Sequence, residues 1–212
     1  MLNIFVSPGD VFDEVIAAPR AWANCRLPML LLCLAGITSI QITHGEHTAA
    51  GLRQLAPAGA LPNPQAAMLS GGWPLVASLT VCLAVFAGTL WSSFVLWFMG
   101  RVFLKARFSY LKTLEVVGLT GMILVLGTVI TSLLIAASGD AAARPALSLF
   151  AGRLDAGHPL RQALDAINVF HLWTTTVLAV GLSRLSGVSF KEAAFWVFGG
   201  WLFARISLIL LA

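Results

Sequence analysis

The residue best placed for chemistry is Arg205, because it lies inside the last long apolar segment of the chain. At 1.5 Å per residue it lies about 18 Å along a helix that starts at residue 193, roughly two-thirds of the way across a bilayer. A cation at that depth costs about 2.5–3.5 kcal/mol on insertion scales, so it needs a partner or a route to the headgroups. The preceding apolar segment runs the opposite way and brings Asp165, Asn168 and His171 to a similar depth. We therefore predict an outward-facing polar pocket of these four residues; the alternative is that Arg205 extends to the outer headgroups.

Two other ionisable groups lie in apolar surroundings. His171 is either a hydrogen-bonded packing residue or a proton relay. Glu115 lies near one end of its apolar segment, where Lys112, Arg184 or Lys191 could pair with it. We expect a shallow ion pair at the membrane interface.

Six further cations lie in two short turns between apolar segments. They are Arg101, Lys105, Arg107, Lys112, Arg184 and Lys191. Cations in short loops keep those loops in the cytoplasm, and they can also bind anionic lipid headgroups.

No pattern indicates a catalytic, metal or cofactor site. The spacing His44-x-Glu46-His47 does not match a zinc-protease motif, in which the glutamate lies between two histidines on one helical face. The three cysteines, at positions 25, 33 and 82, lie at or within apolar segments, as small packing residues do. No nucleophile–base–acid set or phosphate-binding glycine loop is present. We predict a protein that is not an enzyme and holds no cofactor.

The composition is that of a membrane protein. The chain is 58% hydrophobic and 10% charged, whereas a soluble domain is about 25% charged. Its mean hydropathy is +0.89. The formal charge of +4 is concentrated in short loops rather than in a basic stripe with exposed aromatics, so nucleic-acid binding is not expected.

The elements that must position these residues are long apolar helices. Hydrocarbon offers no water to the backbone, so an apolar segment of about 20 residues crosses it as a helix. We predict an all-α, polytopic bundle with five transmembrane helices at about 27–43, 73–100, 113–137, 167–183 and 193–212. Residues 44–72 and 138–166 are expected to be external loops. Residues 27–212 then form one transmembrane domain.

Small residues recur along the second and third predicted helices. Thr80, Ala84, Gly88 and Ser92 are spaced four apart, and Gly118, Gly121, Gly127, Thr128 and Thr131 follow in the next helix. Such stripes let a second helix approach closely. A substrate path lined by small polar groups is the alternative.

Residues 1–26 are expected to form a cytoplasmic segment with an amphipathic interfacial helix. Ser7 is a suitable N-cap, Pro8 suits the first helical position and Pro19 should end the helix. Its apolar face either lies on the bilayer or packs under the bundle. We favour packing, because the acids on the other faces are repelled by anionic lipid.

Counting cations by side predicts the topology. The proposed inner segments hold eight Lys and Arg residues, whereas the longer outer loops hold only Arg53, Arg144, Arg153 and Arg161. The N-terminus should therefore be cytoplasmic and the C-terminus external.

The stretch DAINVFHLWTTTVLAVGLSRLSGVSFKEA resembles the C-terminal signature of the Yip family of Ypt/Rab-interacting membrane proteins. The positions that carry the resemblance are Asp165, Phe170, Trp173, Gly181, Gly187, Ser189 and Lys191. SPGDVFDEVIAAP and FSYLKTLEVVGLTG are similar to the family's N-terminal segment and to the start of its third span.

The resemblance implies five spans, a cytosolic N-terminus and a role in membrane organisation. The chain lacks the Asp-Leu-Tyr-Gly-Pro motif of eukaryotic members, which puts small-GTPase binding in doubt, and it looks more like the compact bacterial branch. We predict a scaffold or organiser that lies in the lipid bilayer and binds membrane proteins or further copies of itself. The alternative is a small transporter or channel that uses His171 and Arg205.

Overall fold

The computed structural model describes residues 2–19, 22–55, 64–139, 143–146, 164 and 167–211. These residues form a short 3-10 helix, η1, and six α-helices. The elements are η1 (Leu2–Phe5), α1 (Pro8–Ala17), α2 (Ala23–Leu55), α3 (Pro64–Val102), α4 (Tyr110–Ser138), α6 (Val169–Ser186) and α7 (Phe190–Leu211). The predicted all-helical architecture is confirmed.

Three helices of the described part are long and apolar enough to cross a membrane. These candidate spans are Ala23–Thr43, Leu75–Val102 and Tyr110–Ser138. Helices α6 and α7 form where the fourth and fifth spans were expected. His171 and Arg184 lie in α6, and Lys191, Glu192 and Arg205 lie in α7.

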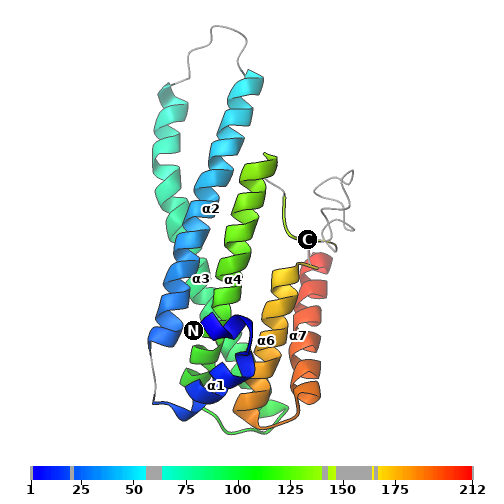
Figure 1. The fold of residues 1–212 in the computed structure, drawn as a ribbon. Coiled ribbons are helices and arrows are strands. Elements are labelled where there is room, and N and C mark those ends of the chain that lie inside the picture. Colours follow the sequence, from blue (N-terminus) through cyan, green and yellow to red (C-terminus); the bar gives the residue numbers. More distant parts are fainter. Residues whose placement is uncertain are drawn as a thin grey trace.

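The prediction of a loop at 44–72 was wrong for most of that segment. Helix α2 continues to Leu55 and α3 already begins at Pro64, so both helices extend beyond the rest of the bundle (Figure 1). Hydropathy marks only the part of a helix that is apolar enough for hydrocarbon. The intervening sequence is rich in alanine, which favours helix, and proline suits a first helical turn.

Local capping explains where α4 and α6 begin and end. The Ser109 hydroxyl accepts a hydrogen bond from Lys112 N (3.3 Å), and the Asn168 side chain accepts one from Phe170 N (2.9 Å). Each helix ends at a glycine in the left-handed region, Gly139 (φ 66°) and Gly187 (φ 73°), a conformation that costs glycine little.

Helix α1 packs beneath the bundle, as expected, against α4 and α6 (Figure 1). Phe12 of α1 and Ile4 of η1 are fully buried with Val116 and Leu119 of α4 and Val177 of α6. The helix starts at Pro8 and ends before Pro19, but the Ser7 side chain makes no capping hydrogen bond, contrary to prediction. Burial of the apolar face therefore does more than capping to hold this short helix in place.

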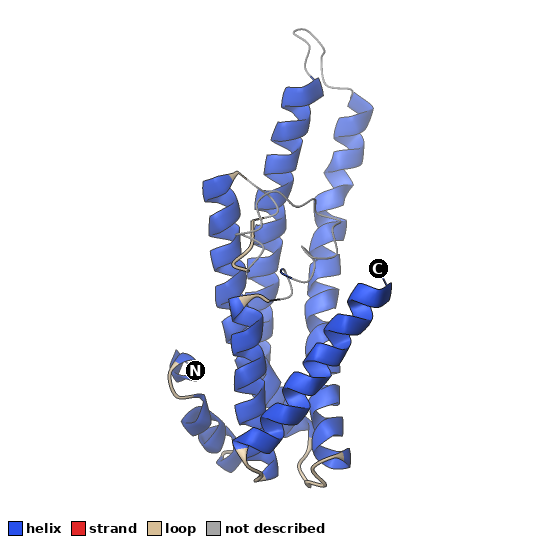
Figure 2. Ribbon diagram, turned by 90° about the vertical axis from the view of Figure 1, so that its right-hand side faces the viewer, coloured by secondary structure: helices blue, strands red, loops and turns tan. Residues whose placement is uncertain are grey.

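The remaining helices lie side by side, and α7, which ends at the C-terminus, is inclined to the others (Figure 2). Helix α4 is central and contacts α2, α3 and α6. At Gly118 the backbone of α2 comes so close that an added Cβ would lie 2.7 Å from Cys25 Cα and 3.1 Å from Asn24 O. The expected role of Gly118 in close helix packing is thus confirmed.

We predict opposite effects for alanine at two helical glycines. Gly118→Ala should lower the free energy of unfolding by about 1–3 kcal/mol, because α2 must move away. Gly199→Ala, where no described atom lies within 4 Å of the added Cβ, should raise it by about 0.5–1 kcal/mol. Unfolding of the purified protein in detergent tests both; equal effects would contradict the close α2–α4 crossing.

Candidate functional site

His171 of α6 and Arg205 of α7 are in direct contact. The distance from Arg205 Nη2 to His171 Nδ1 is 2.6 Å. A guanidinium can only donate, so Nδ1 must accept and the proton of the neutral ring lies on Nε2. The Arg205 guanidinium also lies 5.8 Å from the centre of the Trp201 ring. Arg205 was expected either to contact the preceding helix or to extend to the outer headgroups, and the structure has the contact with His171 of α6. Asp165 lies outside the described residues.

His171 and Asn168 line a polar cavity of about 190 Å³ between α2, α4 and α6. Arg205 is not among its described lining residues and reaches it only through His171. The other lining residues are Ser39, Leu124, Gly127, Thr128, Thr131, Arg144 and Phe170. The structure therefore brings together three of the four predicted residues, two of them at the cavity wall and one behind it.

Among the cavity residues that sequence reasoning did not place in a polar pocket are Ser39 and Arg144. Arg144 belongs to the segment before α6, which is held there by a bridge between Ala146 and Asn168 and by a hydrogen bond from Val169 N to Pro145 O (3.4 Å). Ser39 comes from α2 and lies more than 80 positions before the other lining residues in the chain. Neither lies in a motif that predicts this proximity.

The polar atoms of the cavity have defined roles. Thr128 and Thr131 donate their hydroxyl hydrogens to Leu124 O (2.9 Å) and Gly127 O (2.8 Å). Because Asn168 Oδ1 accepts from the first turn of α6, its amide nitrogen is the group left to act as a donor. No acidic residue is among the described residues that line the cavity.

A second polar cluster lies at the opposite end of the bundle, under α1. Lys112 Nζ donates to Val15 O (2.7 Å) and Ala18 O (2.9 Å) and lies 3.3 Å from Glu115 Oε2. Of the three expected partners of Glu115, Lys112 makes the ion pair. The lysine also satisfies carbonyls at the C-terminus of α1, which lack partners within the helix.

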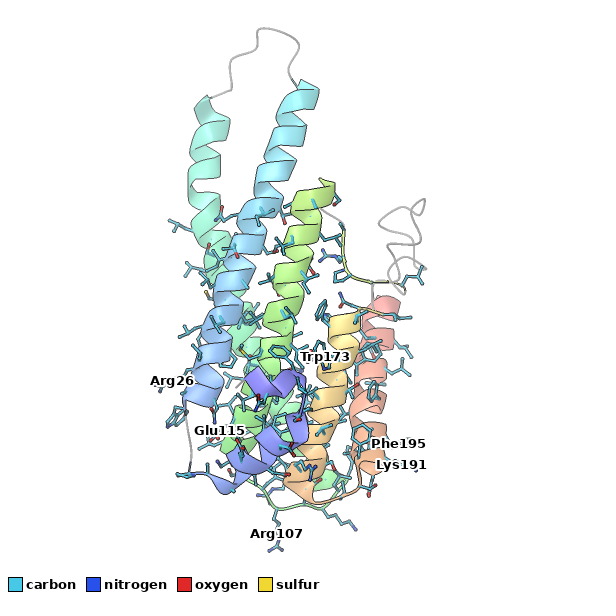
Figure 3. The ribbon with its side chains drawn as sticks, in the orientation of Figure 1. Arg26, Arg107, Glu115, Trp173, Lys191 and Phe195 are labelled. Carbon is cyan, nitrogen blue, oxygen red and sulfur yellow. The ribbon has the colours of Figure 1, made fainter. Side chains whose placement is uncertain are left out.

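The structure divides the six predicted loop cations by their surroundings. Lys112 is largely buried, Arg184 lies 3.2 Å from Asp13 of α1, and Arg101 lies 5.5 Å from the centre of the Trp97 ring. Arg107 points away from the bundle, below the lower ends of the helices (Figure 3). Lys105, Arg107 and Lys191 are exposed at this end.

The small-residue stripe of α3 does not pack against another helix of the chain. No described atom lies within 4 Å of a Cβ added at Gly88. Ala84, Gly88 and Ser92 instead line a groove of about 240 Å³ that is closed on its other sides by α2, α4 and α6. Among the described residues, the stripe therefore lines a groove and forms no tight seam with another helix of the same chain.

Within the described residues, no three His, Cys, Asp or Glu side chains form a group that could hold a metal ion. The side chains of His44, Glu46 and His47 are outside the described part. The three cysteines are free.

The Yip1 domain family model matches residues 2–212. The chain belongs to the Yip1 domain family. This confirms the resemblance and identifies the chain as a membrane protein. Comparison with curated proteins and with solved structures gave no match.

We predict that Lys112→Met weakens the anchoring of α1 in this Yip1-domain chain. The substitution leaves Glu115 buried without its ion-pair partner and two carbonyls without a donor, which should cost about 3 kcal/mol. Faster proteolysis within residues 1–18 in detergent, and a lower unfolding temperature than that of the unmodified protein, would show the weaker anchoring. Adding Glu115→Gln should restore part of the loss, and Lys191→Met is the exposed control. No recovery in the double variant would contradict the pairing.

A double-mutant cycle with His171→Phe and Arg205→Met should give a coupling energy of about 0.5–3 kcal/mol. The reason is that the two side chains share a direct hydrogen bond. Unfolding in detergent measures the four free energies. Additive effects would indicate that Arg205 interacts mainly with headgroups.

Proposed function

We propose that this Yip1-domain protein is a membrane organiser that acts through lateral contacts in a bacterial inner membrane. In this proposal α2, α3, α4, α6 and α7 are the five spans, the N-terminus is cytoplasmic and the C-terminus is external. The clustering of Arg101, Lys105, Arg107 and Lys191 at the end covered by α1 supports this orientation, because short basic loops stay in the cytoplasm.

The observation that carries the proposal is the closed inner half of the bundle. Phe12, Val116, Leu119 and Ile123 are 0–1% exposed, and α1 covers them from below. Among the described residues, these apolar side chains fill the space between α1, α4 and α6, so they leave no polar route between those three helices toward the cationic end. A transporter needs such a route on both sides of its binding site.

The outer surface is suited to lateral contacts. Only 11% of the apolar stretch Leu75–Val102 of α3 is buried within the protein. Leu75, Leu79 and Leu83 are about 70% exposed and Trp91 is 66% exposed. This surface must be covered by lipid, by another membrane protein or by a second copy of the chain.

The proposed partners are therefore the bilayer and helices within it. A small GTPase and a nucleic acid are not among them, and no catalytic activity is proposed. The exposed loop cations could also hold anionic headgroups.

A small transporter remains the second candidate, because the cavity around His171 and Asn168 offers convergent polar groups. It requires an inward-open state in which α1 or α6 moves away from α4. A transporter moves a solute across the membrane, whereas an organiser does not, so a flux measurement distinguishes the two functions.

We expect the purified protein in liposomes to give no ion or solute flux above empty liposomes. In a variant with its native cysteines replaced by alanine, Leu79→Cys on α3 should crosslink between neighbouring molecules in native membranes. Leu133→Cys on α4, which is similarly exposed (64%), is the matched control. Flux that His171→Phe abolishes, without crosslinking at Leu79, would favour the transporter.

A further inference from the structure

The polar cavity and the apolar groove adjoin each other along the same helices. Leu124 of α4 lines both. On α6, His171 lines the cavity and Thr174 lines the groove one turn further along. On α2, Ser39 lines the cavity and Leu32, two turns away, lines the groove. The groove therefore continues from the cavity toward the cationic end of the bundle.

The cavity suits an oxyanion. Arg144 supplies a cation, and Asn168 and His171 Nε2 supply neutral donors, while no acid is among its described lining residues. Arg205, bound to His171 from behind, adds positive potential without filling the space. A phosphate group matches this combination of charge and donors.

Measured along α4, the cavity lies near the depth of a lipid phosphate. Gly127 to Thr131 lie 17–21 residues from the start of α4 at Tyr110, which is about 26–32 Å along the helix. The hydrocarbon core is about 30 Å thick. If Tyr110 lies at one interface, the cavity lies at the headgroups of the opposite leaflet.

The groove suits a hydrocarbon chain. Pro28, Met29, Leu32, Val85 and Leu178 form apolar walls, and Gly88 and Gly121 leave the space between them. The groove extends over residues 117–124 of α4, about 10 Å, and its volume is about 240 Å³.

We propose that the cavity and the groove together hold one anionic phospholipid of the leaflet opposite the cationic loops. Its phosphate lies against Arg144, Asn168 and His171, and one acyl chain lies along the groove between α3 and α4. This goes beyond the organiser function and requires that α4 crosses the bilayer with Tyr110 at one interface.

The test is lipid binding to the purified full chain, measured by native mass spectrometry and by thermal stabilisation in neutral detergent. The probes are a phosphatidylglycerol, a phosphatidylcholine and inorganic phosphate. We expect phosphatidylglycerol to bind most tightly. Arg144→Gln should weaken its binding about tenfold, and Arg107→Gln, which removes an exposed cation at the other end, should have little effect.

Two variants test the groove. Gly88→Leu and Ala84→Leu project into it from α3 and should each weaken phosphatidylglycerol binding several-fold, whereas Gly199→Leu on α7 should not. Variants are compared only where they elute as a single monodisperse species in size-exclusion chromatography. One well-folded groove variant is enough for the test of the groove. The proposal is overturned if Arg107→Gln weakens binding as much as Arg144→Gln. It is also overturned if inorganic phosphate stabilises the protein as well as the lipid does while groove variants bind normally, which would indicate a free-anion site.

Discussion

The arrangement of this protein depends on how closely its neighbours approach α4. This helix contacts η1, α1, α2, α3 and α6, and a glycine lies at each of two close contacts. Gly118 admits the backbone of α2, and at Gly127 an added Cβ would lie 2.8 Å from the Phe170 ring. In a bilayer, apolar burial gives no net attraction between helices, so van der Waals contact at such small residues decides which helices associate.

The two ends of the bundle stabilise a buried charge in different ways, through the pairs Lys112–Glu115 and Arg205–His171. Near the cationic end, Lys112 is held between Glu115 and the last carbonyls of α1, so one side chain neutralises a buried acid and completes a helix terminus. Toward the other end, Arg205 meets the neutral ring of His171 and the face of Trp201. An arginine beside a neutral donor–acceptor ring keeps its charge, and that charge is then available to the adjoining cavity.

The two sides of α4 differ in how tightly they are packed. Helices α1, α4 and α6 enclose an apolar core, whereas α3 borders a groove that it shares with α2, α4 and α6. In the proposed organiser, this groove opens to lipid rather than to a central aqueous path. This asymmetry underlies both the proposed organiser function and the proposed lipid site.

Much of this could be read from the sequence because it follows from local chemistry. Apolar length predicted helices at α2, α3, α4, α6 and α7, and the proline spacing around residues 8–19 predicted α1. The loop at 44–72 was misjudged, because helix propensity persists after hydropathy falls.

Only the tertiary structure decided which faces meet. The spacing of Ala84, Gly88 and Ser92 is the same whether a helix packs on it or leaves a groove, and only the placement of α2, α4 and α6 around α3 decides which occurs. Likewise, Ser39 and Arg144 join His171 only because α2 and the segment before α6 converge on α4. Helix positions follow from the solvation of each residue's own backbone and side chain, whereas these contacts depend on residues far apart in the chain.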